Sequence, residues 1–96
     1  TGWTTGDFEG KGNNPNSSYD VWLAKFLPDG TQSWVRQFGS PGDDASYLAG
    51  MTIDADDNIF LAGYTNNHLS GSNAGSYDGW VASYDAEGNQ RWLQQF

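Results

Sequence analysis

Short runs of apolar residues, separated by turn signals, recur along the chain and predict β-strands rather than helices. Residues 21–26 are apolar on both faces apart from Lys25, which is typical of a strand covered by a layer on each side. Residues 47–53 show no helix cap and no apolar stripe of helical period, so we expect a strand there too. The predicted strands are residues 3–5, 21–26, 32–38, 47–53, 59–64, 80–84 and 90–96.

The connections between these strands alternate in length along the chain. The long ones, rich in Gly, Asn and Ser, are residues 7–18, 39–46 and 66–78, and the short ones are residues 27–30, 54–58 and 86–89. Successive connections of an antiparallel meander lie at opposite ends of the sheet. We therefore expect all long loops at one end of the molecule and all tight turns at the other.

The segment at residues 18–38 returns at residues 76–96. Ten of the 21 aligned positions are identical, at a spacing of 58 residues, and most others exchange similar side chains. A fixed period of this size is the signature of a repeat architecture. We expect residues 39–96 to form one complete unit and residues 1–38 to be the last strands of another.

Four short antiparallel strands per unit, apolar on both faces, describe one blade of a β-propeller. The chain would then supply about 1.6 blades, as an excised fragment or as a self-assembling unit. Each blade buries its faces against neighbouring blades. The expected partners are therefore further blades of the same propeller or identical chains.

Several segments together resemble the SBBP-type β-propeller repeats of bacterial secreted and surface proteins. These are residues 42–44, residues 54–58 followed by Ile-Phe-Leu-Ala-Gly-Tyr-Thr, residues 78–82, and Gly88 with Trp92. One departure is Asp57, where the family commonly has glycine. The resemblance implies a propeller fold, an extracellular or cell-surface location and no defined catalytic chemistry.

The pattern Ala82, Asp85, Gly88, Trp92, repeated in part as Ala24, Gly30 and Trp34, is similar to the tryptophan-docking motif of quinoprotein propellers. That similarity implies that Trp34 and Trp92 are largely buried between adjacent blades. We expect Trp22 and Trp80 to join them in blade docking. A quinoprotein enzyme would need a cofactor pocket as well, and likeness of fold does not supply one.

Composition narrows the choice of partners. Twelve acidic residues against four basic ones give a net charge of −8, which disfavours binding to nucleic acid or to anionic membranes. The sequence has no apolar run of membrane-spanning length. It also has no cysteine, which excludes disulfides and thiol catalysis.

The long-loop end is the expected ligand site. Its predicted ligand-binding residues are Asp43, Asp44, Asn66, Asn67, Tyr77 and Asp78, and Asn13, Asn14, Asn16, Tyr19 and Asn73 add to its polar and aromatic character. Amides beside aromatic rings would suit a neutral glycan, whereas loops also hold such residues for turn formation. Both interpretations stay open.

Two acidic stretches could bind a cation, and calcium is the cation that their oxygens suit. Asp43 and Asp44 are the stronger metal candidates. Asp54, Asp56 and Asn58 match the start of a calcium loop, but its sixth and twelfth positions lack Gly and Glu, which favours a hydrogen-bonded turn. The single histidine, His68, has no nucleophile motif beside it, and we expect a solvated loop residue.

These observations predict a structural or interaction module, without enzymatic activity or a cofactor, that has a protein or a glycan as ligand. The alternative is a glycan-binding, lectin-like propeller. A fragment of a propeller enzyme, hydrolase or quinoprotein, is the less favoured third interpretation.

Overall fold

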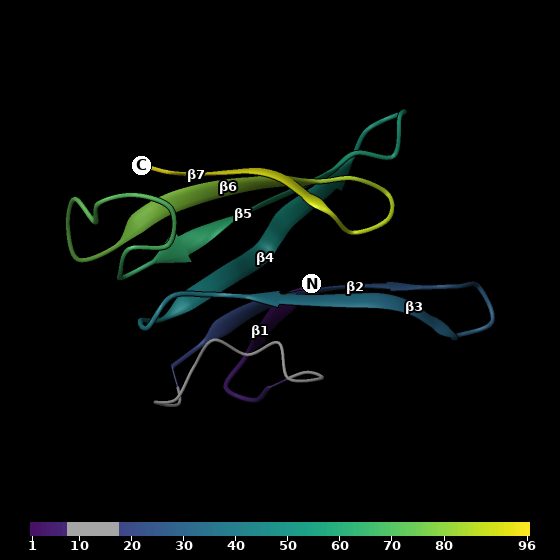
Figure 1. Ribbon diagram of the computed structural model, residues 1–96, viewed down its shortest axis with the longest axis horizontal. Helices are drawn as coiled ribbons and strands as arrows, with labels where there is room; N and C mark the ends of the chain where they lie inside the picture. The colour runs from purple at the N-terminus through teal and green to yellow at the C-terminus, as the bar shows by residue number, and fades with distance from the viewer. Residues whose placement is uncertain (8–17) are drawn as a thin grey trace.

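The computed structural model describes residues 1–7 and 18–96, except for the side chains of residues 46–49, as two antiparallel sheets (Figure 1). The N-terminal sheet has the order β1 (Gly2–Thr4), β2 (Asp20–Phe26), β3 (Gln32–Phe38). The C-terminal sheet has the order β4 (Asp44–Ile53), β5 (Ile59–Thr65), β6 (Asp78–Tyr84), β7 (Gln90–Gln95). The all-β prediction is confirmed. The described residues contain no helix, and so none that could cross a membrane.

The start of β4 differs from the prediction. Residues 39–46 were expected to be a loop, but Asp44, Ala45 and Ser46 pair with Thr65, Tyr64 and Gly63 of β5. The register then shifts between Ser46 and Met51, which marks a bulge or irregularity. Such a shift interrupts the two-residue period on which a strand is recognised, and the predicted strand therefore began three residues late.

Two of the tight turns are held by an aspartate at their first position. The Asp54 carboxylate accepts hydrogen bonds from the backbone N–H groups of Asp56 and Asn58, at 2.9 Å each, and from the Asn58 side chain. Asp85 does the same for the turn that ends at Asn89. These bonds hold the pKa of both carboxyls below the usual value. The calcium-loop pattern at residues 54–58 therefore forms a hydrogen-bonded turn.

The long loops at residues 39–43 and 66–77 lie at one end of the molecule and the tight turns at the other, as the alternating connection lengths predict (Figure 1). At the long-loop end, the loops are tied together by backbone bonds. Asp44 N–H donates to the Tyr19 carbonyl at 2.7 Å, and Asn66 N–H donates to the Asp43 carbonyl at 3.1 Å. Tyr19 and the loops at residues 39–43 and 66–77 are therefore connected at this end.

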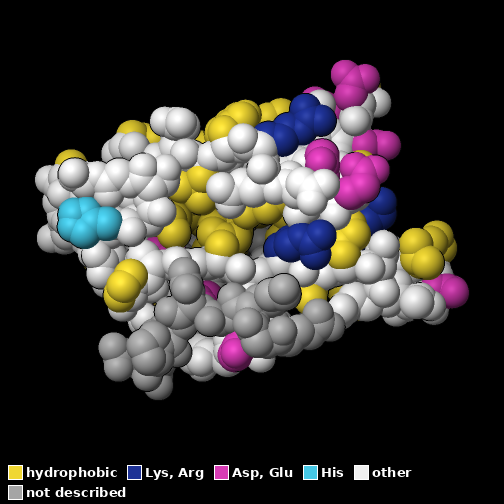
Figure 2. Space-filling model, viewed as in Figure 1, with side chains coloured by type: hydrophobic (Ala, Val, Ile, Leu, Met, Phe, Trp, Pro, Cys, Tyr) yellow, Lys and Arg dark blue, Asp and Glu magenta, His cyan; other side chains and the backbone are white. Residues whose placement is uncertain are grey.

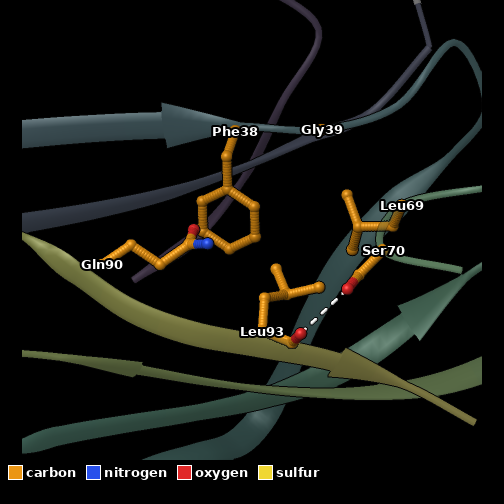
Figure 3. Close-up of a pocket in the computed structure, with 6 residues that line it drawn as sticks. All are labelled: Phe38, Gly39, Leu69, Ser70, Gln90 and Leu93. Carbon is orange, nitrogen blue, oxygen red and sulfur yellow. Dashed lines mark hydrogen bonds between the residues drawn. The ribbon is translucent and has the colours of Figure 1, made fainter.

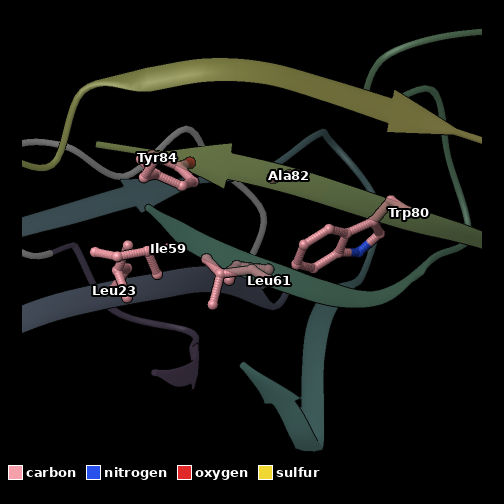
Figure 4. Close-up of a cluster of buried hydrophobic side chains, with 7 residues drawn as sticks. Leu23, Ile59, Leu61, Trp80, Ala82 and Tyr84 are labelled. Carbon is pink, nitrogen blue, oxygen red and sulfur yellow. The ribbon is translucent and has the colours of Figure 1, made fainter. Parts of the chain in front are cut away.

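The core lies between the two sheets (Figure 4). The N-terminal sheet contributes Val21 and Leu23 from β2. The C-terminal sheet contributes Ile59 and Leu61 from β5 and Trp80, Ala82 and Tyr84 from β6. Because a fully buried Leu or Ile side chain stabilises a fold by about 1.5–3 kcal/mol, this shared core holds the two sheets against each other.

Candidate functional site

The outer strand of the N-terminal sheet docks onto a hairpin turn of the C-terminal sheet. From β3, Trp34 Nε1 donates to the Ala86 carbonyl at 3.2 Å. Arg36 Nε donates to the Gly88 carbonyl at 2.7 Å, and its Nη2 donates to the Glu87 carbonyl at 3.1 Å. The guanidinium also lies 5.3 Å from the centre of the Trp34 ring. Charge-assisted bonds of this kind fix orientation as well as contact.

The same turn provides the surface on which Trp34 rests. Gly88 has a φ of 80°, and a Cβ placed on it would lie 2.8 Å from the Trp34 ring. Glycine is required here both for the left-handed backbone and for the close approach of the indole. Gly30 has a φ of 88° in the corresponding turn, but there a Cβ would meet no atom within 4 Å.

Phe38, at the end of β3, completes the docking contact with aromatic packing. Its ring centre is 5.6 Å from that of Trp80, edge to face, and 5.9 Å from that of Tyr84. Burial raises the pKa of the Tyr84 phenol, whose hydroxyl hydrogen-bonds to the side chain of Gln90 at 3.0 Å. Trp34, Arg36 and Phe38 therefore form one continuous contact with the C-terminal sheet, which we call the internal interface.

Positions 58 residues apart, which we call repeat-equivalent, differ in burial according to whether a sheet covers them. Trp80 is fully buried and its equivalent Trp22 is partly buried; Tyr84 is 2% exposed, whereas its equivalent Phe26 is 57% exposed. Trp34 is half-buried, whereas Trp92 is 41% exposed. The expectation that Trp92 is largely buried is therefore wrong for this chain, because no described strand packs beyond its side of β7.

Shallow clefts follow the internal interface. One is lined by Phe38 and Gly39 from the end of β3, Leu69 and Ser70 from the long loop, and Gln90 and Leu93 from β7 (Figure 3). The Ser70 hydroxyl donates to the Leu93 carbonyl at 2.8 Å and closes one side of it. Figure 2 shows apolar side chains in the hollow between the two sheets. This cleft is a seam between packed sheets and has no charged side chain in its lining.

At the long-loop end, the structure brings Asp43 and Asn66 together. The Asn66 side-chain oxygen accepts from Asp43 N–H at 2.7 Å, and the Asp43 carboxylate accepts from Tyr19 N–H at 3.2 Å. The Asn66 amide donates to the same carboxylate at 3.5 Å. Both predicted ligand-binding residues are thus used in joining the loops at residues 39–43 and 66–77 to each other and to Tyr19.

Asp44 is fully buried at the first position of β4. Its Oδ2 accepts from the backbone N–H and, at 2.8 Å, from the hydroxyl of Ser40, while Oδ1 has no hydrogen-bond partner among the described residues. Loss of hydration raises the pKa of this carboxyl, the nearby Thr65 hydroxyl and the hydrogen bonds from Ser40 oppose the shift, and the negative charge of Asp20 adds to it. Asp44 therefore does not face solvent, in contrast to the ligand site expected from the sequence.

Asp78 and Asp20 make the same contact in the two sheets, a pairing that sequence reasoning missed. Gln95 Nε2 donates to Asp78 at 2.8 Å, and Gln37 Nε2 donates to Asp20 at 2.9 Å. All four residues are among the identities of the repeat. The aspartate and the glutamine are each identical in the two copies of the repeat, and they lie on neighbouring strands. This identity was the sequence signal that could have indicated the pair.

Of the other candidate loop residues, some make hydrogen bonds to neighbouring segments and some are exposed to solvent. Asn67 accepts a bond from Gln95 through its backbone carbonyl at 2.9 Å. His68 is exposed, and its Nδ1 accepts from Asn73 N–H at 3.0 Å. Tyr77 is 63% exposed. Asn13, Asn14 and Asn16 lie outside the described residues.

Exposed aromatic rings form a second feature of the long-loop end. Tyr77 packs edge to face on Tyr64 at 5.4 Å, and in the N-terminal sheet Tyr19 and Trp3 of β1 pack in the same way at 4.5 Å. Trp3 is 54% exposed. The sequence prediction did not include Trp3, although Gly2-Trp3-Thr4 matches Gly63-Tyr64-Thr65 at a spacing of 61 residues.

The described residues contain no group of three or more His, Cys, Asp or Glu side chains placed to hold a metal ion. On the face shown in Figure 2, acidic side chains gather at the tight-turn end, where Asp54, Asp56, Asp57 and Glu87 are exposed. The carboxylates of Asp43 and Asp44 both accept hydrogen bonds from other residues of the chain. Calcium binding at these two residues stays a prediction from the sequence.

Two antiparallel sheets, stacked face to face and related by an internal repeat, are characteristic of a β-propeller repeat protein. Residues 33–70 match the family model for the SBBP β-propeller repeat, which confirms the resemblance over those residues. The matched segment runs from β3 into the loop after β5, and so spans the junction between the two sheets. No curated protein matches the chain.

Proposed function

We propose that this chain is a structural and interaction module of a secreted or cell-surface protein, in which consecutive sheets stack through a repeated tryptophan contact. The observation that carries this proposal is the internal interface. Trp34, Arg36 and Phe38 all project from one strand onto the neighbouring sheet, and two of them bond to backbone carbonyls of a turn. Backbone recognition suits a scaffold, because it does not depend on the side chains of the turn.

Matched variants of repeat-equivalent tryptophans test this role. Trp34→Ala removes the ring from the internal interface and should lower the free energy of unfolding by about 2–3 kcal/mol, since the ring is half-buried. Trp92→Ala removes the same side chain from an exposed position and should cost under about 1 kcal/mol. Urea denaturation of both variants at the same low protein concentration measures the two losses.

The proposal fails if the two tryptophan variants lose equal stability. Equal losses would mean that Trp34 acts within its own sheet and that the sheets do not depend on this contact. A normal unfolding slope in urea for both variants is the control that each still unfolds from a compact state.

A second candidate function is glycan binding, favoured by the aromatic pairs of the long-loop end. Each pair has an exposed ring beside polar loop residues, and the pair recurs in both sheets. Exposed aromatic rings are suited to stacking on the apolar face of a sugar. A repeated site of this kind would make the module lectin-like.

Titration of the chain with a panel of neutral glycans, followed by tryptophan fluorescence and calorimetry, tests this candidate. We expect binding to weaken at least about tenfold in Tyr77→Ala and in Trp3→Ala, because each loses an exposed ring. Trp92→Ala, far from these loops on β7, is the control. The absence of saturable binding to any glycan in the panel would leave the structural role alone.

A further inference from the structure

The chain carries two surfaces that correspond to the two halves of its internal interface. The first, which we call the outgoing face, consists of Trp92, Gln94 and Phe96 on and after β7. The second, the incoming face, consists of Trp22, Ala24 and Phe26 on β2 with the following turn, residues 27–31. We propose that the outgoing face of one copy of this chain docks on the incoming face of a second copy, head to tail. This inference rests on the proposed structural role.

The outgoing face repeats the residues that dock inside the chain. Trp92, Gln94 and Phe96 are repeat-equivalent to Trp34, Arg36 and Phe38. Trp92 is 41% exposed and Phe96 is 73% exposed. Large exposed apolar rings on one face of a strand form an apolar patch, and such patches mark surfaces that bind a partner.

The incoming face repeats the residues that receive the contact. Trp22, Ala24 and Phe26 are repeat-equivalent to three residues of β6 that the internal interface buries almost completely, namely Trp80, Ala82 and Tyr84. Phe26 is 57% exposed in its place. On the C-terminal sheet, β3 covers the surface formed by these β6 residues. The N-terminal sheet has an equivalent surface on β2.

The receiving turn is also reproduced in its backbone. Leu27 N–H bonds to the Thr31 carbonyl at 2.8 Å and Gly30 N–H to the Leu27 carbonyl at 2.9 Å, which matches the bonds of Asp85 and Gly88 in the other turn. The carbonyls of this turn can therefore accept from an indole N–H as those of the other turn do. The space that Trp34 fills above Gly88 is open above Gly30.

The contact between copies should be weaker than the internal one, for two reasons. Gln94 stands where Arg36 supplies a charged, forked donor, and the N-terminal sheet has three strands where the C-terminal sheet has four. Each copy also carries a net charge of −8, so like-charge repulsion opposes association and added salt should strengthen it.

The two faces differ, so the contact is heterologous and can continue from copy to copy. This property gives a sharp experiment with two variants. Trp92→Ala disables the outgoing face only. Gly30→Asn disables the incoming face only, since asparagine tolerates the left-handed backbone while its side chain occupies the space where the second indole would lie.

Sedimentation equilibrium of the 96-residue chain, at concentrations up to about 1 mM and in two salt concentrations, measures the result. We expect the mass of the unmodified chain to rise with concentration beyond the dimer. Each variant alone should associate at least about tenfold more weakly. An equimolar mixture of the two variants should form dimers and nothing larger, because one intact contact remains between them.

Three results would overturn the inference: an unmodified chain that stays monomeric throughout, variants that associate like the unmodified chain, or a mixture that forms no dimer. The last would indicate a symmetric contact that uses both faces at once. None of these results bears on the stability contrast between Trp34→Ala and Trp92→Ala. The association between copies and the structural role can therefore fail separately.

Discussion

The N-terminal and C-terminal sheets have the same residue at many repeat-equivalent positions, but they do not bury those positions equally. Tyr84 is 2% exposed and Phe26 57%, although both are aromatic residues at the end of the corresponding strand. Asp20 and Asp78, by contrast, are buried in both sheets and bonded to the equivalent glutamine. Burial of the sheet faces thus depends on the neighbouring sheet, whereas the aspartate–glutamine pair belongs to each sheet itself.

Among repeat-equivalent variants, we expect the largest difference in stability loss between Phe38→Ala and Phe96→Ala. Phe38→Ala removes a ring that packs on Trp80 and Tyr84, and we expect a loss of about 3 kcal/mol. Phe96 is 73% exposed, so Phe96→Ala should cost under about 1 kcal/mol. Urea denaturation of both variants at the same low concentration gives the comparison. A larger loss in Phe96→Ala would mean that the outer face is covered in solution.

The next largest difference in stability loss should be found at the two turn glycines, Gly88 and Gly30, which both have a left-handed backbone. Gly88→Ala brings a methyl group within 2.8 Å of the Trp34 ring and should cost about 2–4 kcal/mol. Gly30→Ala meets no atom within 4 Å, so only the backbone term of about 1 kcal/mol remains. The difference between the two losses, measured by thermal unfolding, isolates the docking of Trp34. Equal losses would show that the ring moves away without cost.

Much of the fold could be predicted from the sequence because repetition and turn chemistry are local signals. Alternating connection lengths placed the loops, and the aspartates with Asn58 indicated the hydrogen-bonded turn at residues 54–58. The start of β4 could not be predicted, since its shift in register breaks the two-residue period. Asp57 has a φ of 60°, so this departure from the family pattern keeps the left-handed backbone of the turn.

The candidate site was harder to predict, because the sequence does not show whether a polar side chain faces solvent or another loop. Asp43 and Asn66 bond to each other and to the backbone, and Asp44 is fully buried. The docking tryptophans were predicted from their similarity to the tryptophan-docking motif of quinoprotein propellers, which occurs in both copies of the repeat. Repetition alone, however, could not distinguish half-buried Trp34 from exposed Trp92, because that difference depends on which neighbour is present.

The smallest effect that we expect contrasts the buried carboxyl of the long-loop end with the exposed carboxyls of the tight turns. Burial raises the pKa of Asp44 above its usual value of 3.8, whereas hydrogen bonds lower the pKa of Asp54 and Asp85. A raised folded-state pKa means that the folded chain binds more protons than the unfolded chain just above pH 3.8. Asp44 should therefore lower stability as the pH rises through this window, while Asp54 and Asp85 lower it as the pH falls below 3.8.

Asp44→Asn separates these contributions, because the amide oxygen can still accept from Ser40 while the charge is removed. The melting temperature of the variant should exceed that of the unmodified chain at pH 7, and the difference should shrink as the pH falls toward 3.8. Thermal unfolding between pH 3 and 7, in a chelator, measures this trend. If the variant is instead less stable at pH 7, the Asp44 charge is compensated in the folded chain. Calcium added in place of the chelator tests the calcium prediction separately: binding through the Asp44 carboxylate should raise the melting temperature of the unmodified chain and leave that of Asp44→Asn unchanged.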